Sequence, residues 1–110
     1  MRIIDRTTVQ RRFGRATLVE ALPEKYWRDW YLPGAKHLPH DRVLQLAPTA
    51  LPDKATEIVV YCASATCRNS HIAAQALEQL GYTNVGVYPG GKQDWQDAGL
   101  PVERGASAAA

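Results

Sequence analysis

Short apolar runs rich in β-branched residues divide the chain, and each of them predicts a strand. The clearest run is Glu57–Tyr61, which is continuous and bounded by polar loops. Thr17–Ala21 and Asn84–Tyr88 also predict strands, and Ala35–Leu38 predicts a shorter one. The chain therefore carries several strands that are set apart by longer segments.

A helical pattern follows the clearest strand. Asn69 or Ser70 is suited to cap the start of this helix, and Gly81 is suited to end it. Between them, apolar residues recur at one-turn spacing, which predicts an amphipathic helix. The residues expected to face the core are Ile72, Ala73, Ala76, Leu77 and Leu80.

Other segments predict further helices between the strands. Residues 6–13 form one, and another begins at Pro23, because proline is tolerated in a first helical turn. A helix over residues 41–47 is expected to end at Pro48, and residues 92–98 form the last one. Strands that alternate with helices predict an α/β fold with a mainly parallel sheet and right-handed crossovers.

Length and composition are those of an ordinary globular protein. The chain has 110 residues, 45% of them hydrophobic and 22% charged, so we expect one domain over residues 1–104 with its core at about 17–103. Residues 105–110 are expected to form a flexible C-terminal tail. The net charge is only +2, which argues against a nucleic-acid partner.

No segment predicts a membrane span or a secretory signal. The longest strongly apolar run, Ile58–Cys62, is far too short to cross a bilayer. The N-terminal arginines precede no apolar stretch, and Asp5 argues against a transit peptide. The two cysteines lie in one short segment, where reactive chemistry is a better interpretation than a structural disulfide. We therefore expect a cytoplasmic protein with reduced thiols.

Cys62 follows the clearest strand and precedes a helix, and this position favours reactivity. The carboxyl end of a parallel strand is where α/β sheets place their sites, and the free N–H groups of a helix start favour an anion. We therefore expect the pKa of Cys62 to be lowered. Small residues such as Ala63 and Ser64 would let the loop curl around an anion, and Arg68 would add a positive charge. The same local pattern also fits a buried, inert cysteine.

Short motifs spread over most of the chain carry a resemblance to a known family. They are Leu18-Val19-Glu20, Leu32-Pro33-Gly34-Ala35, Val59-Val60-Tyr61-Cys62, Leu80-Gly81-Tyr82-Thr83-Asn84-Val85, Gly90-Gly91-Lys92-Gln93-Asp94-Trp95 and Ala98-Gly99-Leu100-Pro101-Val102. Taken together, in this order, they resemble the rhodanese-like family of single-domain sulfurtransferases. The resemblance implies a mainly parallel five-stranded sheet flanked by helices. It also implies that Cys62 is the persulfide-forming nucleophile.

Two departures from the family pattern bear on the site. Many members carry an Asp and an Arg near the end of the first long strand, where this chain has Glu20 and Leu22, so an ion pair formed by that Arg is missing. Common single-domain rhodaneses place an Arg one residue closer to the cysteine than Arg68 lies to Cys62. The resulting Cys-x5-Arg spacing resembles Cdc25-type phosphatases and arsenate reductases. Alignment on Ser70 instead makes the loop two residues longer.

The resemblance implies a thiosulfate-type sulfurtransferase that works through a persulfide on catalytic Cys62. The donor would be thiosulfate or a similar small anion, and the acceptor would be cyanide, a small thiol or a protein thiol. No cofactor, metal, nucleic acid or membrane is expected, and the chain is expected to be a monomer or homodimer. Two alternatives stay open, namely oxyanion chemistry of the arsenate reductase or phosphatase type and a binding module without turnover. The substrate- and anion-binding loop is expected to consist of Ala63, Ser64, Ala65, Thr66, Cys67 and Arg68.

Cys67 has two interpretations. It could resolve a persulfide or sulfenate on Cys62 by forming a disulfide, or it could be a small residue that fills the loop, which we favour. A metal site formed by Cys62, Cys67 and His71 is disfavoured, because the spacing is not a standard zinc pattern and a fourth ligand is missing.

Overall fold

A single parallel sheet forms the centre of the computed structural model, which describes residues 1–104. The five strands lie in the order β1-β5-β4-β2-β3, and every pair runs parallel. The expected tail, residues 105–110, lies outside the described residues. The strands are β1 (Arg2–Ile3), β2 (Thr17–Glu20), β3 (Lys36–His37), β4 (Ile58–Tyr61) and β5 (Val85–Tyr88).

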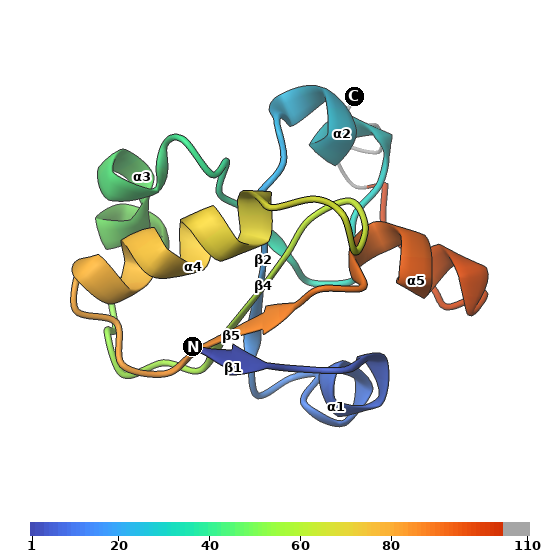
Figure 1. Ribbon diagram of the computed structural model, residues 1–110, viewed down its shortest axis with the longest axis horizontal. Helices are drawn as coiled ribbons and strands as arrows, with labels where there is room; N and C mark the ends of the chain where they lie inside the picture. Colours follow the sequence, from blue (N-terminus) through green and yellow to red (C-terminus); the bar gives the residue numbers. More distant parts are fainter. Residues whose placement is uncertain (105–110) are drawn as a thin grey trace.

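Helices cover both faces of this sheet. α3 and α4 pack together on one face, whereas α1 and α5 lie on the other (Figure 1). The loop after β2 leads to α2, which lies beyond the carboxyl end of the sheet strands (Figure 1). The helices are α1 (Arg6–Arg11), α2 (Glu24–Asp29), α3 (Val43–Ala50), α4 (Asn69–Gln79) and α5 (Gly91–Asp97). The predicted α/β class with a parallel sheet is confirmed.

The central strand β4 is buried along its whole length, because its side chains enter two separate cores. Ile58 and Val60 pack with α3 and α4, and Val59 and Tyr61 pack with α1 and α5. All four of these residues are fully shielded from solvent. A strand covered on both faces needs a continuous apolar sequence, which is the pattern that made β4 the clearest strand to predict.

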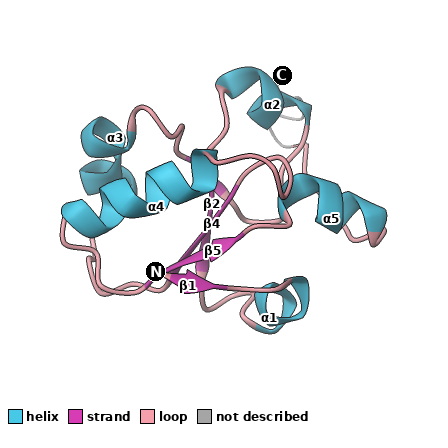
Figure 2. Ribbon diagram, viewed as in Figure 1, coloured by secondary structure: helices cyan, strands magenta, loops and turns pink. Residues whose placement is uncertain are grey.

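The three central strands end level with one another. Glu20 at the end of β2 pairs with Tyr61 at the end of β4, and Tyr61 pairs with Tyr88 at the end of β5. Because the strands are parallel, the loops that follow them leave from one edge of the sheet, and the loop after β4 rises beside α4 and α5 (Figure 2). This edge is where parallel sheets place their functional groups.

Two local predictions were wrong, and one strand was missed. Pro48 lies inside α3 and does not end it. Its missing N–H would have bonded the carbonyl of Leu44, a residue that is 61% exposed, so water can satisfy that carbonyl. β1 pairs with the edge of the sheet although its two residues carry too little pattern to predict a strand.

The second wrong prediction concerns α4. Its N-cap is Arg68, and neither Asn69 nor Ser70 caps it with a side chain. Ile72 is 46% exposed, and the buried side is formed by Ser70, Ala73, Ala74 and Leu77. The other four residues expected to face the core do so, since Ala73 and Leu77 are buried and Ala76 and Leu80 pack against the same core. Only Ile72 was placed on the wrong side. None of the helices within residues 1–104 is long and apolar enough to cross a membrane.

Candidate active site

Cys62 lies directly after β4, at the carboxyl edge of the sheet. Only 1% of the residue is exposed. Its Sγ lies 3.4 Å from the main-chain oxygen of Cys67 and 3.3 Å from Oγ of Ser70. The loop that leaves β4 therefore turns back, so that the start of α4 closes over the sulfur.

Burial dominates the electrostatics of this thiol. The pKa of Cys62 is raised, first by desolvation and then by a hydrogen bond with the Cys67 side chain, whereas the hydroxyl and the backbone N–H of Ser70 lower it. The expected lowering of the pKa was wrong, because the loss of water outweighs the favourable helix start. Ser70 was expected only as a helix cap, and the structure instead makes it the main polar neighbour of the sulfur that favours the thiolate.

The loop between Cys62 and α4 is a tight turn with unused amides. The Cys67 N–H donates to the carbonyl of Ser64 at 3.0 Å. Ala63 and Ser64 are half-buried, whereas Ala65 and Thr66 are exposed. Within residues 1–104, the N–H groups of residues 63–66 donate no hydrogen bond, so they are available to an anion at the loop.

A hollow of about 320 Å³ lies between this loop and α5. Ser64, Ala65 and Thr66 form one wall, and the opposite wall includes Asp94 and Asp97. Asp94 is paired with Arg6 at 2.8 Å, so Asp97 supplies the uncompensated negative charge that disfavours a doubly charged anion there. An anionic donor is therefore better accommodated on the α4 side of the loop.

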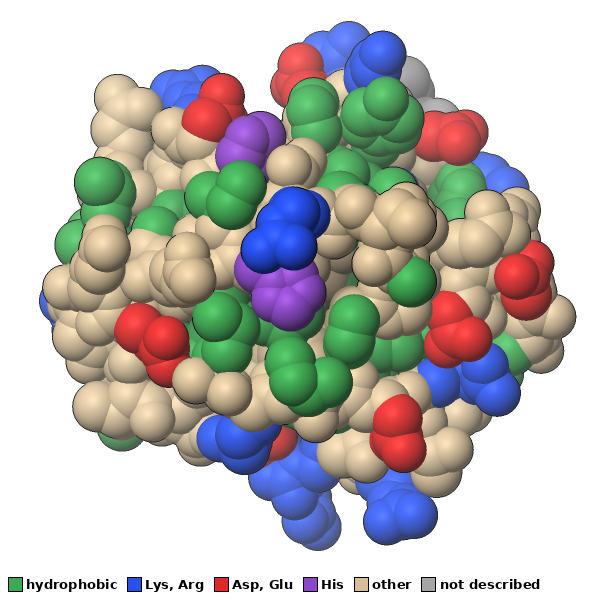
Figure 3. Space-filling view, viewed as in Figure 1, with side chains coloured by type: hydrophobic (Ala, Val, Ile, Leu, Met, Phe, Trp, Pro, Cys, Tyr) green, Lys and Arg blue, Asp and Glu red, His purple; other side chains and the backbone are tan. Residues whose placement is uncertain are grey.

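Arg68 stands on that α4 side. It is exposed, and its guanidinium makes no ion pair or hydrogen bond to another described residue. Figure 3 shows cationic and histidine side chains together near the middle of the face, over the amino-terminal end of α4. A free guanidinium beside a helix start raises the local concentration of anions.

α5 approaches the back of the Cys62 loop through a glycine. Gly91 has φ +63°, and a Cβ on it would lie 2.4 Å from the carbonyl oxygen of Cys62. The next two N–H groups of this helix, on Lys92 and Gln93, donate to the carbonyls of Cys62 at 2.9 Å and Ala63 at 2.8 Å. Only glycine permits this approach, so Gly91 and α5 fix the main chain at the nucleophile.

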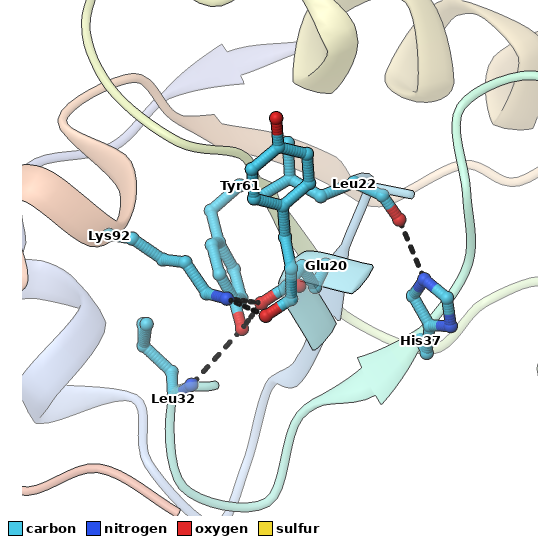
Figure 4. Close-up of polar contacts among 7 residues, drawn as sticks. Glu20, Leu22, Leu32, His37, Tyr61 and Lys92 are labelled. Atoms are coloured by element: carbon cyan, nitrogen blue, oxygen red, sulfur yellow. Dashed lines mark hydrogen bonds and ion pairs between the residues drawn. The ribbon is translucent and has the colours of Figure 1, made fainter. Parts of the chain in front are cut away.

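A buried polar network lies one strand away, at the end of β2 (Figure 4). Glu20 is fully buried, and its Oε1 lies 3.0 Å from Nζ of Lys92 and accepts a hydrogen bond of 3.0 Å from the Tyr61 hydroxyl. The N–H of Leu32 donates to the same tyrosine oxygen at 3.1 Å. Burial raises the pKa of Glu20, and Lys92 and Tyr61 oppose this effect.

Lys92 links this network to both α2 and the nucleophile. Its Nζ donates to the carbonyl of Tyr26 at 2.8 Å and lies 4.8 Å from the centre of the Trp30 ring. Its backbone N–H holds Cys62, as described above. Leu22 offers no charge to Glu20, and the cation that pairs with this carboxylate comes instead from α5.

The network could not be recognised from one local motif, because its parts lie far apart in the sequence. The available signal was the position of Glu20 within an otherwise apolar strand. A carboxylate there is expected to have a buried partner. The partner is Lys92, which the sequence places in a glycine motif where its burial is not apparent.

The aromatic residues near α2 have a structural role. Trp27 stacks on Tyr31 with ring centres 3.7 Å apart and on His37 at 5.1 Å. Nε2 of His37 lies 2.6 Å from the carbonyl of Leu22.

Across residues 1–104, no three His, Cys, Asp or Glu side chains gather in a way that could hold a metal.

Comparison with known proteins identifies the family. Residues 5–98 match the rhodanese-like domain. The chain therefore belongs to the rhodanese-like family, as the combined motifs predicted, and the parallel five-stranded sheet agrees with that assignment.

The individual relatives are more distant. The HTH-type transcriptional regulator Rv0324 of Mycobacterium tuberculosis is 30% identical over 97 residues, which cover 88% of this chain and 42% of that protein. The thiosulfate sulfurtransferase PspE of Escherichia coli is 36% identical over 64 residues, which cover 58% of this chain and 59% of that protein. This chain thus spans less than two thirds of the length of either relative.

A solved structure gives the same fold. The thiosulfate sulfurtransferase of Pseudomonas aeruginosa superposes with a TM-score of 0.82 at 24% identity, over 94% of this chain and 20% of its own. At that identity the likeness concerns the fold alone.

Proposed function

We propose that this domain is a sulfurtransferase in which Cys62 carries a sulfane sulfur from an anionic donor of the thiosulfate type to a thiol or cyanide. The main support for this function is the position of the Cys62 thiol, which is enclosed at the end of the central strand under a loop with free N–H groups. Membership of the rhodanese-like family and the relationship with PspE support this function.

The first step forms the persulfide. The Cys62 thiolate attacks the outer sulfur of thiosulfate, the S–S bond of the donor breaks, and sulfite leaves with the bonding electrons. Arg68 attracts the dianion, and the unused N–H groups of residues 63–66 stabilise the departing sulfite. The hydroxyl and N–H of Ser70, which favour the thiolate, then stabilise the negative charge of the persulfide.

The second step returns the free thiol. An acceptor such as cyanide or a thiolate attacks the outer sulfur of the persulfide, and Cys62 leaves as a thiolate. Because sulfite departs before the acceptor reacts, the kinetics follow a ping-pong pattern. The shielding of Cys62 favours a small acceptor or a protein thiol that protrudes from its own surface. Where the acceptor is a protein, we propose that the transfer takes place in the cytoplasm.

Intact mass tests the proposal directly. The reduced protein is treated with thiosulfate and desalted, with the Cys62→Ser variant as the matched control. We expect the wild type to take up one sulfur on Cys62. This sulfur is seen either as a gain of about 32 Da or as sulfide released from the Cys62 persulfide. The control should show neither. A wild type that takes up no sulfur would contradict the proposal. Turnover of arsenate or an aryl phosphate in that case would instead support oxyanion chemistry at the Cys-x5-Arg loop.

A further inference from the structure

Cys67 is a second free thiol in the loop that follows Cys62, and the proposed transfer does not use it. The structure places its main-chain oxygen 3.4 Å from Sγ of Cys62. This contact brings the Cys67 backbone over the sulfur of Cys62, five residues earlier in the same short loop. Both cysteines are free.

The two cysteines differ in access. Cys62 is enclosed, whereas Cys67 is half-buried at the surface of the loop. The N–H of Cys67 donates to the carbonyl of Ser64, and this turn holds the Cys67 main chain next to the sulfur of Cys62. A soluble reductant that cannot enter the pocket can therefore reach the pair through Cys67.

We propose that Cys67 resolves the Cys62 persulfide and releases its outer sulfur as sulfide. A dithiol reductant then restores both thiols, so that the cycle can repeat. This inference rests on the proposed persulfide and names the reductant class as dithiols.

This step releases the outer sulfur as hydrosulfide and leaves a Cys62–Cys67 disulfide. The Cys67 thiolate attacks Sγ of Cys62, the bond from Sγ to the outer sulfur breaks, and that sulfur leaves as hydrosulfide with both electrons. The proton lost from Cys67 ends on the departing sulfide. A dithiol then reduces the Cys62–Cys67 disulfide by two thiol–disulfide exchanges and becomes a disulfide itself, which frees both cysteines for another donor.

One single-turnover experiment distinguishes this inference from the function on which it rests. Wild type, Cys67→Ser and Cys62→Ser are treated with thiosulfate without oxygen, desalted and weighed under non-reducing conditions, while released sulfide is trapped and measured. We expect the wild type to lose about 2 Da and to release about one equivalent of sulfide. We expect Cys67→Ser to keep a gain of about 32 Da with no sulfide, and Cys62→Ser to do neither.

The other outcomes have defined meanings. A wild type that retains the extra sulfur and releases no sulfide overturns the role of Cys67, as does a disulfide formed without sulfide. A Cys67→Ser variant that stays unchanged, beside a wild type that reacts, also overturns it. If neither protein takes up sulfur, the proposed persulfide itself is wrong. Cys67→Ala, compared by urea unfolding and by the same mass measurement, guards against an effect of misfolding.

Discussion

Two groups leave the same edge of the sheet and are held in opposite ways. At the end of β4, the sulfur of Cys62 makes two long contacts, at 3.3 and 3.4 Å, under a loop whose N–H groups are largely unused. At the end of β2, Glu20 is held by Lys92 and Tyr61, each at 3.0 Å. The sulfur of Cys62 can therefore exchange its contacts easily, whereas the carboxylate of Glu20 is held in place by its partners.

The contrast separates chemistry from support. A nucleophile must exchange neighbours as donor, sulfite and acceptor come and go, so loosely held contacts suit it. The network at β2 makes no such exchange, but Lys92 bonds Glu20 through its side chain and Cys62 through its backbone. A rigid ion pair thereby positions the main chain from which the reactive loop begins.

Removal of the sulfur from the loop has the largest expected effect. Cys62→Ser should lower the formation of thiocyanate from thiosulfate and cyanide by at least about 10³-fold, because a serine hydroxyl cannot form the persulfide. The stability of this variant in urea should stay close to that of the wild type. Retained turnover would show that another group carries the sulfur.

Breaking the ion pair should instead affect folding. Glu20→Gln leaves the ammonium of Lys92 buried without its carboxylate, so we expect a loss of about 3–5 kcal/mol in the free energy of unfolding. The double variant Glu20→Gln with Lys92→Met should recover most of that loss, because no unpaired charge remains. Urea unfolding of the set measures both, and a single variant that costs under about 1 kcal/mol would contradict the buried pair.

The link between the two regions can be tested at a glycine. Gly91→Ala and Gly99→Ala both place a side chain at positive φ, but a Cβ at Gly99 has nothing within 4 Å, whereas one at Gly91 meets the Cys62 carbonyl. Each should lose about 1–2 kcal/mol for its backbone conformation. Gly91→Ala should lose about 1–3 kcal/mol more and should also slow persulfide formation. Equal losses in thermal or urea unfolding would show that α5 adapts.

The pH dependence distinguishes a buried thiol from an activated one. The pKa of Cys62 is raised above its ordinary value of 9.0, so the thiolate fraction grows throughout the neutral and mildly alkaline range. In Cys67→Ser, single-turnover persulfide formation should therefore accelerate about tenfold per pH unit and still rise at about pH 9. A plateau near neutrality would mean that the bound donor or the loop lowers the pKa.

Arg68 should have the smallest effect, since its guanidinium is solvated. Arg68→Gln should raise the KM for thiosulfate by about three- to tenfold at low salt, with little change in kcat, and the difference should shrink as salt is added. Arg42→Gln, which removes an exposed arginine outside the loop, is the matched control. A large fall in kcat for Arg68→Gln would place this side chain in the transition state.

The sequence was sufficient for the features that depend on local pattern. The continuous run of β4, the helix that stops just before Gly81 and the position of Cys62 between them all follow from neighbouring residues. Ser70 as the partner of the sulfur, and Lys92 as the partner of Glu20, depend on how separate elements pack. The raised pKa of Cys62 has the same origin, because the amount of water lost at a strand end is a property of the assembled fold.

The approach of Gly91 to the Cys62 carbonyl also limits how this domain can be redesigned. Within residues 1–104, exposed Ala65 and Thr66 make no main-chain hydrogen bond, so this part of the loop can be varied to admit larger donors. The distance between α5 and the nucleophile cannot be varied in the same way, because two backbones are already in contact there. A loop grafted from another protein would therefore need to bring its own glycine turn and the following helix with it.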